Sequence, residues 1–314
     1  RMTKRNPGET NVAVLLGGWS AEREVSLSSG EGCAEALRRA GFNVTPIDVQ
    51  RETIFSVLQG LRPDVAFNAL HGKWGEDGCA SALLETLQIP YTHSGVLASS
   101  LAMHKEKSKH LFHEAGIPVA ESVLVEIEVA ATQHPMALPY VLKPVDEGSS
   151  VGVHIVTEQS NGPAAIILEQ RELFGSHVMA ERFIPGRELT CAVMGDVALG
   201  VIDIISKVGF YDYRAKYSPG GSQHILPADI PKDVYRKCQQ YSLQAHQALG
   251  CRGVSRSDFR YDDTHGPAGE LILLEINTQP GMTGTSLVPE LAAHSGHSYE
   301  ELVTWMVNDA SINR

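Results

Sequence analysis

The chain has 314 residues, of which 43% are hydrophobic and 20% are charged, and its formal net charge at pH 7 is −11. This is the composition of a soluble globular protein, and the length favours two or three domains over a single core. The negative charge opposes binding to nucleic acid or to an anionic membrane. Any phosphate group must therefore be bound by a local basic site.

The five cysteines are odd in number, widely spaced and never in CxxC spacing. This pattern argues against a disulfide framework and against a zinc site, and we expect reduced, mostly buried thiols. The first five residues lack the apolar segment of a signal peptide, and no run of about 18 apolar residues occurs. The sequence therefore predicts a cytoplasmic protein.

The first third of the chain alternates short apolar runs with amphipathic segments. Strands are predicted at residues 11–16, 43–49 and 64–69, with helices at residues 22–40 and 53–61 between them. We expect Ser20 to cap the first helix and Gly41 to end it. Repeated strand and helix units predict an open parallel sheet, in which ligands bind beyond the carboxyl ends of the strands.

A second unit begins with a helix around residues 105–115, and a third begins near residue 189. The stretch at residues 117–125 follows this helix, and strands are predicted at residues 140–143 and 177–183, before a hinge at Pro185-Gly186. The elements predicted in the third unit are strands at residues 189–194, 198–205, 255–261 and 271–276 and a helix at residues 232–249. The sequence thus predicts an α/β protein with domains at residues 1–104, 105–188 and 189–314.

Acidic side chains follow the glycine turn after the first predicted strand. Glu22 lies at the start of the next helix, where its carboxylate could bind an ammonium group. Acids are common at helix N-termini because they interact favourably with the helix dipole, and on sequence alone this simpler explanation is the more frequent one. The glycines Gly17 and Gly18 do not form GxGxxG, so a dinucleotide-binding fingerprint is absent.

Two further polar segments follow predicted strands. Residues 71–78 come after the third strand and are expected at the ligand-facing edge of the sheet, although an ordinary surface loop is equally compatible. Lys143 lies on a strand that leads into a loop containing Gly148, whose backbone N–H groups could bind phosphate oxygens. This loop is not a Walker A motif, and a simple hairpin is the alternative.

Carboxylates interrupt two apolar strands in the last third of the chain. Asp258 lies in one strand, and Glu275 and Asn277 share a face of the other because they are two positions apart. Buried acids need compensation, and two carboxylates with an amide suit a Mg²⁺ ion that also binds a nucleotide. A buried ion pair with Arg256 is the alternative, but it leaves Glu275 and Asn277 unexplained.

Taken together and in this order, these motifs resemble the ATP-grasp superfamily, in particular the D-alanine–D-alanine ligases, over roughly residues 11–307. The most specific segments are LLGG with SAEREVS, EGSSVG, YDY with AKY, and NT with PGMT, at residues 15–18, 20–26, 147–152, 211–213, 215–217, 277–278 and 280–283. The resemblance implies an ATP-grasp fold, with an N-terminal open parallel sheet domain and two α+β domains that sandwich ATP.

The activity implied by the resemblance is ATP-dependent joining of two D-alanine molecules through a D-alanyl phosphate, for peptidoglycan precursor synthesis. The implied cofactors are two Mg²⁺ or Mn²⁺ ions bound by Asp258, Glu275 and Asn277, and the implied assembly is a homodimer. The residues implied for ATP are Lys105, Lys143 and Ser150 at the phosphates, Glu181 with the backbone at Phe183 and Ile184 at adenine, and Glu188 at the ribose.

Residue roles toward the amino acids also follow from the resemblance. Glu22 would bind the ammonium group of the first D-alanine beside His71, in a hydrogen-bonded bridge with Ser149 and Tyr217. Arg256 and the backbone at Gly281 would form the oxyanion site. Ser286 and Leu287 would bind the carboxylate of the second D-alanine, and Lys216 would approach the transferring phosphate from a mobile lid at residues 207–223.

Three positions depart from the family pattern, and all of them concern nucleotide affinity. His104 stands where aspartate is usual, Phe183 where tryptophan is frequent, and Arg260 where an apolar residue often contacts adenine. A D-alanine–D-lactate ligase is the nearest rival, and Tyr217 favours the amine-using form. The presence of Lys143, Asp258 and Glu275 opposes a non-catalytic nucleotide-binding regulator, and the missing fingerprint opposes a dehydrogenase.

Overall fold

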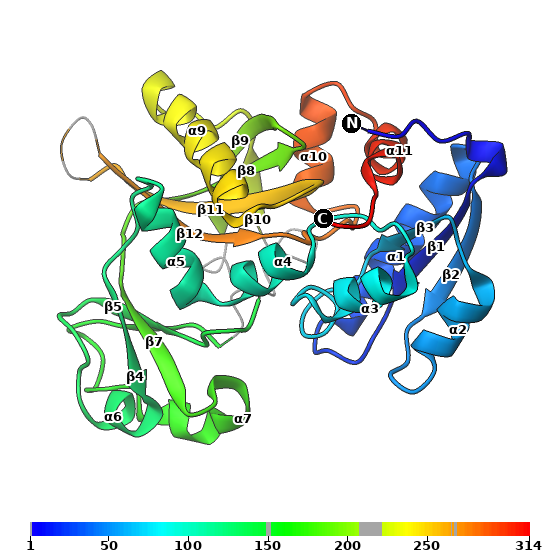
Figure 1. Ribbon diagram of the computed structural model, residues 1–314. Helices are drawn as coiled ribbons and strands as arrows, with labels where there is room; N and C mark the ends of the chain where they lie inside the picture. The colour runs from blue at the N-terminus through cyan, green and yellow to red at the C-terminus, as the bar shows by residue number, and fades with distance from the viewer. Residues whose placement is uncertain (1, 149–151, 207–221, 265, 267–268) are drawn as a thin grey trace.

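The computed structural model describes residues 2–148, 152–206, 222–264, 266 and 269–314. Three sheets connected by helices make up the fold (Figure 1). The first sheet has the order β2-β1-β3 and is parallel. Its strands are β1 (Asn11–Leu16), β2 (Asn43–Asp48) and β3 (Val65–Asn68). The open parallel sheet predicted for the start of the chain is therefore confirmed.

Alternation along β1 divides its side chains between two cores. Val12 and Val14 pack with α1 (Arg23–Arg39) and α11 (Tyr299–Asp309), whereas Leu15 packs with α2 (Ile54–Leu61) and α3 (Cys79–Leu87). Helices thus cover both faces of the sheet, as expected for buried parallel strands. The short 3-10 helix η1 (Pro7–Glu9) precedes β1.

The predicted cap of the first helix was wrong. The helix α1 begins at Arg23, and its N-cap residue is Glu22, whose side chain makes no capping hydrogen bond. Ser20 instead accepts a hydrogen bond from the backbone N–H of Glu22 at 3.1 Å and donates to the carbonyl oxygen of His71 at 2.7 Å. Ser20 therefore joins the turn after β1 to the loop after β3. Gly41 follows the helix with a φ of 96°, as a helix stop requires.

The second sheet is antiparallel, with the order β4-β7-β5-β6. Its strands are β4 (Ser122–Glu126), β5 (Tyr140–Lys143), β6 (His154–Val156) and β7 (His177–Arg182). Leu142 and Ala180 pack on one face against α6 (Ile127–Thr132), η2 (Ala165–Gln170) and α7 (Arg171–Phe174). By alternation, Lys143 and Glu181 lie on the opposite face.

The stretch at residues 117–125 is extended into a strand only in its last part. The strand β4 begins at Ser122. Pro118 has no backbone N–H and cannot donate to a strand ladder. Its carbonyl oxygen instead accepts a hydrogen bond from the backbone N–H of Leu273 at 3.0 Å. This segment therefore links the second sheet to the third.

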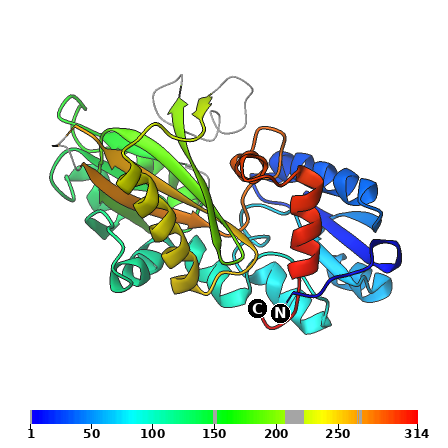
Figure 2. The same cartoon turned by 90° about the horizontal axis from the view of Figure 1, so that it is seen from above.

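The third sheet is antiparallel and has the order β10-β9-β8-β11-β12. Its strands are β8 (Arg187–Met194), β9 (Val197–Ser206), β10 (Ser222–Ile225), β11 (Val254–Asp262) and β12 (Glu270–Asn277). One face packs against α4 (Val96–Met103), α5 (Lys105–Glu114) and α9 (Lys232–Leu249), and the other packs against α10 (Leu287–His294). Figure 2 shows α9 lying across the strands of this sheet.

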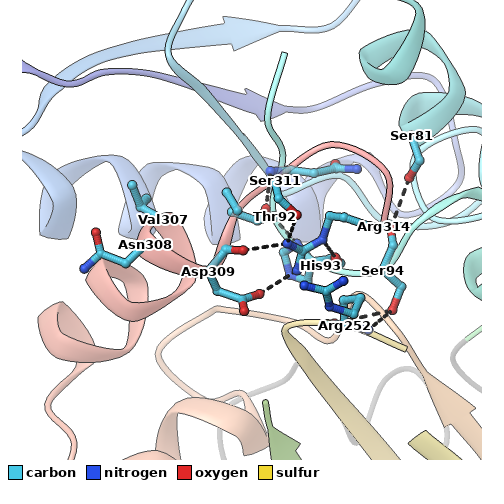
Figure 3. Close-up of polar contacts among 12 residues, drawn as sticks. Ser81, Thr92, His93, Ser94, Arg252, Val307, Asn308, Asp309, Ser311 and Arg314 are labelled. Carbon is cyan, nitrogen blue, oxygen red and sulfur yellow. Dashed lines mark hydrogen bonds and ion pairs between the residues drawn. The ribbon is translucent and has the colours of Figure 1, made fainter. Parts of the chain in front are cut away.

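The end of the chain returns to the first sheet. Tyr91 forms an isolated antiparallel bridge with Ser311. The fully buried guanidinium group of Arg314 pairs with Asp309 at 2.5 Å and donates to the carbonyl oxygen of His93 at 2.6 Å (Figure 3). Because α10 and α11 also complete the core beneath β1, the last residues hold the first and third sheets together.

All five cysteines are free, and all but Cys79 are buried, as the sequence predicted. Among the residues that the structure describes, no helix combines the length and apolar character needed to cross a membrane.

Candidate active site

A pocket lies where loops from the three sheets meet. Residues that line it come from the loop after β3, the start of α5, the loop after β5 and the end of β12, and they include Glu76, Lys105, Glu147, Gly148, Glu275 and Asn277. Three of these residues, Lys105, Glu275 and Asn277, were predicted to bind ATP or metal. The fold therefore brings chain segments from all three predicted domains to one place.

The predicted metal ligands face each other across two neighbouring strands. Asp258 on β11 is the register partner of Glu275 on β12, and Arg256 is the partner of Asn277. Arg256 donates to both carboxylate oxygens of Asp258, at 3.0 Å each. The ion pair considered as an alternative is thus present, and it lies beside Glu275 and Asn277. Lys105 adds a positive charge 3.9 Å from Oε2 of Glu275.

The donor set at these strands suits a hard cation. Two carboxylates and the amide oxygen of Asn277 are oxygen ligands, which Mg²⁺ prefers. The parts of the chain that the structure describes hold no group of three or more His, Cys, Asp or Glu side chains arranged around one metal position. A Mg²⁺ ion would therefore take its remaining ligands from phosphate oxygens and water, which is its usual behaviour at nucleotide sites.

Lys143 lies in an ion-pair network with Glu181. The carboxylate of Glu181 is 2.6 Å from Lys143 through Oε1 and 2.6 Å from Lys109 through Oε2. Burial opposes the ionisation of Glu181, but the two ammonium groups hold the pKa of this carboxyl below its usual range. Burial also lowers the pKa of Lys109, although Glu181 opposes that shift. The predicted phosphate residue Lys143 and the predicted adenine residue Glu181 are therefore direct neighbours.

The residues predicted to hold adenine and ribose surround one arginine. Arg260 pairs with Glu188 at 2.9 Å and donates through Nε to the carbonyl oxygen of Ile184 at 2.9 Å. Its guanidinium carbon lies 5.5 Å from the centre of the Phe183 ring. Arg260 and Glu188 are register partners on β11 and β8, and so they share a face of the third sheet. Two of the three departures from the family pattern, Phe183 and Arg260, therefore contact each other.

Two buried carboxylates meet near the start of α1. Glu22 and Glu76 are 5% and 7% exposed. A Cβ on Gly72 would lie 2.9 Å from Oε2 of Glu22, and a Cβ on Gly148 would lie 3.1 Å from Oε1 of Glu76, so glycines permit this close approach. Burial and the charge of Glu22 raise the pKa of Glu76 well above its usual range. Such a pair of acids favours a cationic ligand, as predicted for Glu22.

His71 is buried, and protein groups occupy both of its ring nitrogens. Nδ1 lies 3.0 Å from the carbonyl oxygen of Gln279, and Nε2 lies 3.0 Å from the hydroxyl of Ser29. Since a carbonyl oxygen can only accept, Nδ1 carries the proton and Nε2 accepts from Ser29. Burial lowers the pKa of His71 to about 4, so the ring is neutral at pH 7. Direct contact between His71 and an amino-acid substrate stays a prediction.

The predicted oxyanion and carboxylate residues lie in the loop between β12 and α10. Gly281 is buried in this loop, Ser286 is the N-cap residue of α10, and Leu287 is its first residue. The N-terminus of a helix favours anions through its dipole and its backbone N–H groups. The Ser286 hydroxyl accepts a hydrogen bond from the backbone N–H of Thr283 at 2.9 Å, which closes the loop.

Four predicted residues lie outside the described part of the chain. They are Ser149, Ser150, Lys216 and Tyr217, and the last two belong to the segment predicted as a lid at residues 207–223, of which only the final two residues are described.

Sequence reasoning missed three buried residues that shape the site. Glu76 was part of the polar segment at residues 71–78 but was given no role. Lys109 lies four positions after Lys105 on α5, and this spacing places both lysines on one helix face. Gln279 lies between the predicted metal ligand Asn277 and Gly281, but the partners of its side chain are more than 200 positions away. Only the first two carried a sequence signal.

Comparison with known proteins places the chain in a family. The family model described as "D-ala D-ala ligase C-terminus" matches residues 111–308. A D-alanine–D-alanine ligase of Parvibaculum lavamentivorans is 63% identical over 97% of this chain and 98% of that protein. The D-alanine–D-alanine ligase B of Mesorhizobium japonicum is 59% identical over 97% of this chain and 99% of that protein.

Solved structures agree with these relatives. The D-alanine–D-alanine ligase of Bacillus anthracis in complex with ATP superposes with a TM-score of 0.78 at 29% identity, covering 96% of each chain. The VanG D-Ala:D-Ser ligase of Enterococcus faecalis superposes with a TM-score of 0.76 at 29% identity, covering 95% of this chain and 98% of that one. The full-length identity, the matching family model and the shared fold show that this chain belongs to the D-alanine–D-alanine ligase family.

Proposed function

We propose that this protein joins two molecules of D-alanine into D-alanyl-D-alanine at the expense of ATP, for the synthesis of peptidoglycan precursors. The observation that carries the proposal is the convergence in one pocket of Glu275 and Asn277 from β12, the cationic Lys105 and the buried acid Glu76. Asp258 on β11 is the register partner of Glu275, and the buried carboxylate of Glu22 lies beside Gly72. The groups on β11 and β12 together with Lys105 suit a metal-bound nucleotide. The acids Glu22 and Glu76 suit an ammonium group. Membership of the family supports the same assignment.

The first step requires activation of a carboxylate, because a carboxylate oxygen is a poor leaving group for an attacking amine. ATP would phosphorylate the first D-alanine and give D-alanyl phosphate and ADP. Lys105 and Lys143 would neutralise phosphate charge, and Glu22 would bind the ammonium group of this first D-alanine. Asp258, Glu275 and Asn277 would hold Mg²⁺ or Mn²⁺, which supplies further charge neutralisation when bound.

The second step joins the two amino acids. The free amine of the second D-alanine attacks the acyl carbon, the carbonyl oxygen becomes an oxyanion, and phosphate leaves as the carbonyl reforms. Arg256 and the backbone N–H of Gly281 would stabilise that oxyanion. Ser286 and Leu287 at the start of α10 would bind the carboxylate of the second D-alanine.

The proposal also covers the assembly, the roles of the three parts of the chain and four further residues. The chain would act as a cytoplasmic homodimer, and its three parts at residues 1–104, 105–188 and 189–314 would contribute the first amino-acid site, the ATP cradle and the metal and second amino-acid sites. Ser149 and Tyr217 would bridge to Glu22, and Ser150 and Lys216 would contact the phosphates.

The proposal is tested by incubating the purified protein with ATP, Mg²⁺ and D-alanine and measuring ADP, phosphate and dipeptide together. We expect one ADP and one phosphate for each D-alanyl-D-alanine. Reactions that replace D-alanine by L-alanine serve as controls, and D-serine or D-lactate competing with D-alanine tests the second substrate. Absence of phosphate release that depends on D-alanine would refute the ligase assignment, and preferential formation of the D-serine or D-lactate product would reassign the second substrate.

A further inference from the structure

The side chain of Gln279 crosses from the third sheet into the loop after β3. It is 3% exposed and lies in the segment between β12 and α10. Its amide nitrogen donates to Oδ1 of Asn68 at 2.8 Å and to the carbonyl oxygen of Gly75 at 3.2 Å, and it also contacts the carbonyl oxygen of Leu70. A single amide group therefore joins the segment between β12 and α10 to the loop after β3.

Asn68 complements this amide. Its Oδ1 also accepts from the backbone N–H of Leu70 at 3.1 Å, and its Nδ2 donates to the carbonyl oxygen of Gly75 at 2.9 Å. All groups that face the Gln279 nitrogen are thus acceptors whose orientation is fixed by other bonds. Only a hydrogen-bond donor at this place suits these acceptors. A glutamate side chain has the same shape, but its carboxylate would put another acceptor oxygen against them.

The backbone on either side of Gly281 is held by the same part of the fold. His71 donates to the carbonyl oxygen of Gln279 at 3.0 Å. Ser29 on α1 accepts from the backbone N–H of Met282 at 3.0 Å and donates to His71. The peptide of Gly281 therefore lies between two residues that are anchored to α1 and to the loop after β3.

We propose that Gln279 is a positioning residue for the second reaction step. Its side chain fixes the position of the Gly281 amide relative to the carboxylates of Glu22 and Glu76. The inference rests on the proposed ligase function, in which that amide stabilises the oxyanion. The Gln279 backbone N–H also donates to Oδ1 of Asn277 at 2.9 Å, so the same residue orients a predicted metal ligand. Misplacement of a reacting geometry by about 1 Å can reduce a rate by about 100-fold.

The test compares Gln279→Met and Gln279→Glu with the wild-type protein. Methionine keeps the approximate length of the side chain but removes the hydrogen-bond donors without adding charge. The test can therefore be made with Gln279→Met if Gln279→Glu does not fold. The matched control is Gln239→Glu, because Gln239 on α9 also donates a side-chain amide to a carbonyl oxygen, that of Leu199, far from the pocket. The measurements are turnover, the KM for ATP, and the ratio of phosphate to dipeptide.

We expect Gln279→Met to lower kcat by about 10- to 100-fold and to leave the KM for ATP within about threefold of the wild-type value. The ratio of phosphate to dipeptide should rise above one, because water then attacks D-alanyl phosphate and releases phosphate and D-alanine before the second amine reacts. Gln239→Glu should keep the wild-type ratio. The proposal would be overturned if Gln279→Met lowered the thermal stability but left the ratio of phosphate to dipeptide and the kcat of the folded fraction unchanged.

Amide hydrogen exchange separates this inference from the proposed function. Loss of the Gln279 contacts should accelerate exchange at Met282 and in the loop after β3, whether or not the protein forms a dipeptide. If the wild-type protein forms no dipeptide, the ligase assignment fails, while faster exchange in the variants still shows that Gln279 anchors the backbone around Gly281 to the loop after β3. Unchanged exchange in both Gln279 variants would overturn that role even in an active ligase.

Discussion

The ammonium group of Lys143 lies 2.6 Å from Oε1 of Glu181, on the face of the second sheet opposite its helices. Lys109 occupies the other oxygen of the same carboxylate. Three buried charges therefore compensate one another beside the proposed nucleotide site, with a net excess of one positive charge. This excess suits a site that is to receive phosphate groups.

Glu181→Gln should destabilise the protein because it leaves two buried ammonium groups without a counter-charge. Breaking a buried ion pair by removing one partner costs about 3–5 kcal/mol in free energy of unfolding. Urea denaturation at pH 7 measures the change. Glu128→Gln is the control, since Glu128 forms an exposed ion pair with Arg171 and should have a much smaller effect. Equal effects of both substitutions would contradict the buried network.

Glu275→Gln should leave the fold intact and remove most of the turnover. The substitution takes one charged oxygen ligand from the predicted metal site, and metal stabilisation is worth several kcal/mol, so kcat should fall at least about tenfold. Glu270→Gln is the matched control, because Glu270 lies at the other end of β12 and pairs with Arg182 on the surface. Near-normal kcat of Glu275→Gln at saturating Mg²⁺ would argue against the metal assignment.

Buried histidines should make stability decrease in mild acid. Burial lowers the pKa of His246 to about 4, whereas an unfolded histidine titrates near about 6.5. Between these values the unfolded chain binds a proton that the folded chain does not bind, so stability is full above pH 6.5 and falls toward pH 4. His246→Asn should reduce the pH slope of the unfolding free energy by up to about 1.4 kcal/mol per pH unit. Urea denaturation from pH 4.5 to 7.5 measures this slope, and an unchanged slope would show that folding does not lower the pKa of His246.

The buried pair Glu22 and Glu76 should destabilise the ligand-free protein as pH rises. The pKa of Glu76 is raised, so its contribution is most favourable below the unfolded pKa and is lost as pH rises toward the folded pKa. Glu76→Gln can keep the acceptor for the Gly72 N–H, which lies 3.0 Å from Oε1, while removing the charge. The free energy of unfolding of Glu76→Gln, taken relative to the wild-type protein, should increase as the pH rises from 5 to 8. The exposed Glu301→Gln should show no such trend, and a constant difference for Glu76→Gln would mean that Glu76 ionises normally.

The strands and long helices could be predicted because their hydrophobic patterns are strong over several residues. The helix α9 was predicted with its observed bounds, and β1 and β5 were predicted to the residue. The elements η1, η2, α3, α4, α6, α7, α10, α11, β6 and β10 were missed. Several of them are short or buried on many sides and therefore show little amphipathic period, and their formation depends on tertiary packing.

The residues of the candidate site also divide into those that the sequence could predict and those that it could not. Lys105, Glu275 and Asn277 carry recognisable chemistry at fixed positions along the chain, and the structure brings them into one pocket. Gln279 and Asn68 are ordinary polar residues that gain their role only from a contact between loops far apart in sequence. Local pattern cannot reveal such a contact, because either residue would suit an exposed loop equally well.

The helices that complete the first sheet also bear on how the chain folds during synthesis. The apolar side chains of β1 and β3 pack against α10 and α11, which are translated after all the strands. On the order of 220 residues separate β3 from α10, and at 5–20 residues per second this interval lasts roughly 10–45 s. During that time one apolar face of the nascent sheet lacks its final cover. Apolar surface that is exposed in this way during synthesis is prone to aggregation. The long sequence separation also predicts slow folding of the first sheet compared with the local hairpin of β8 and β9.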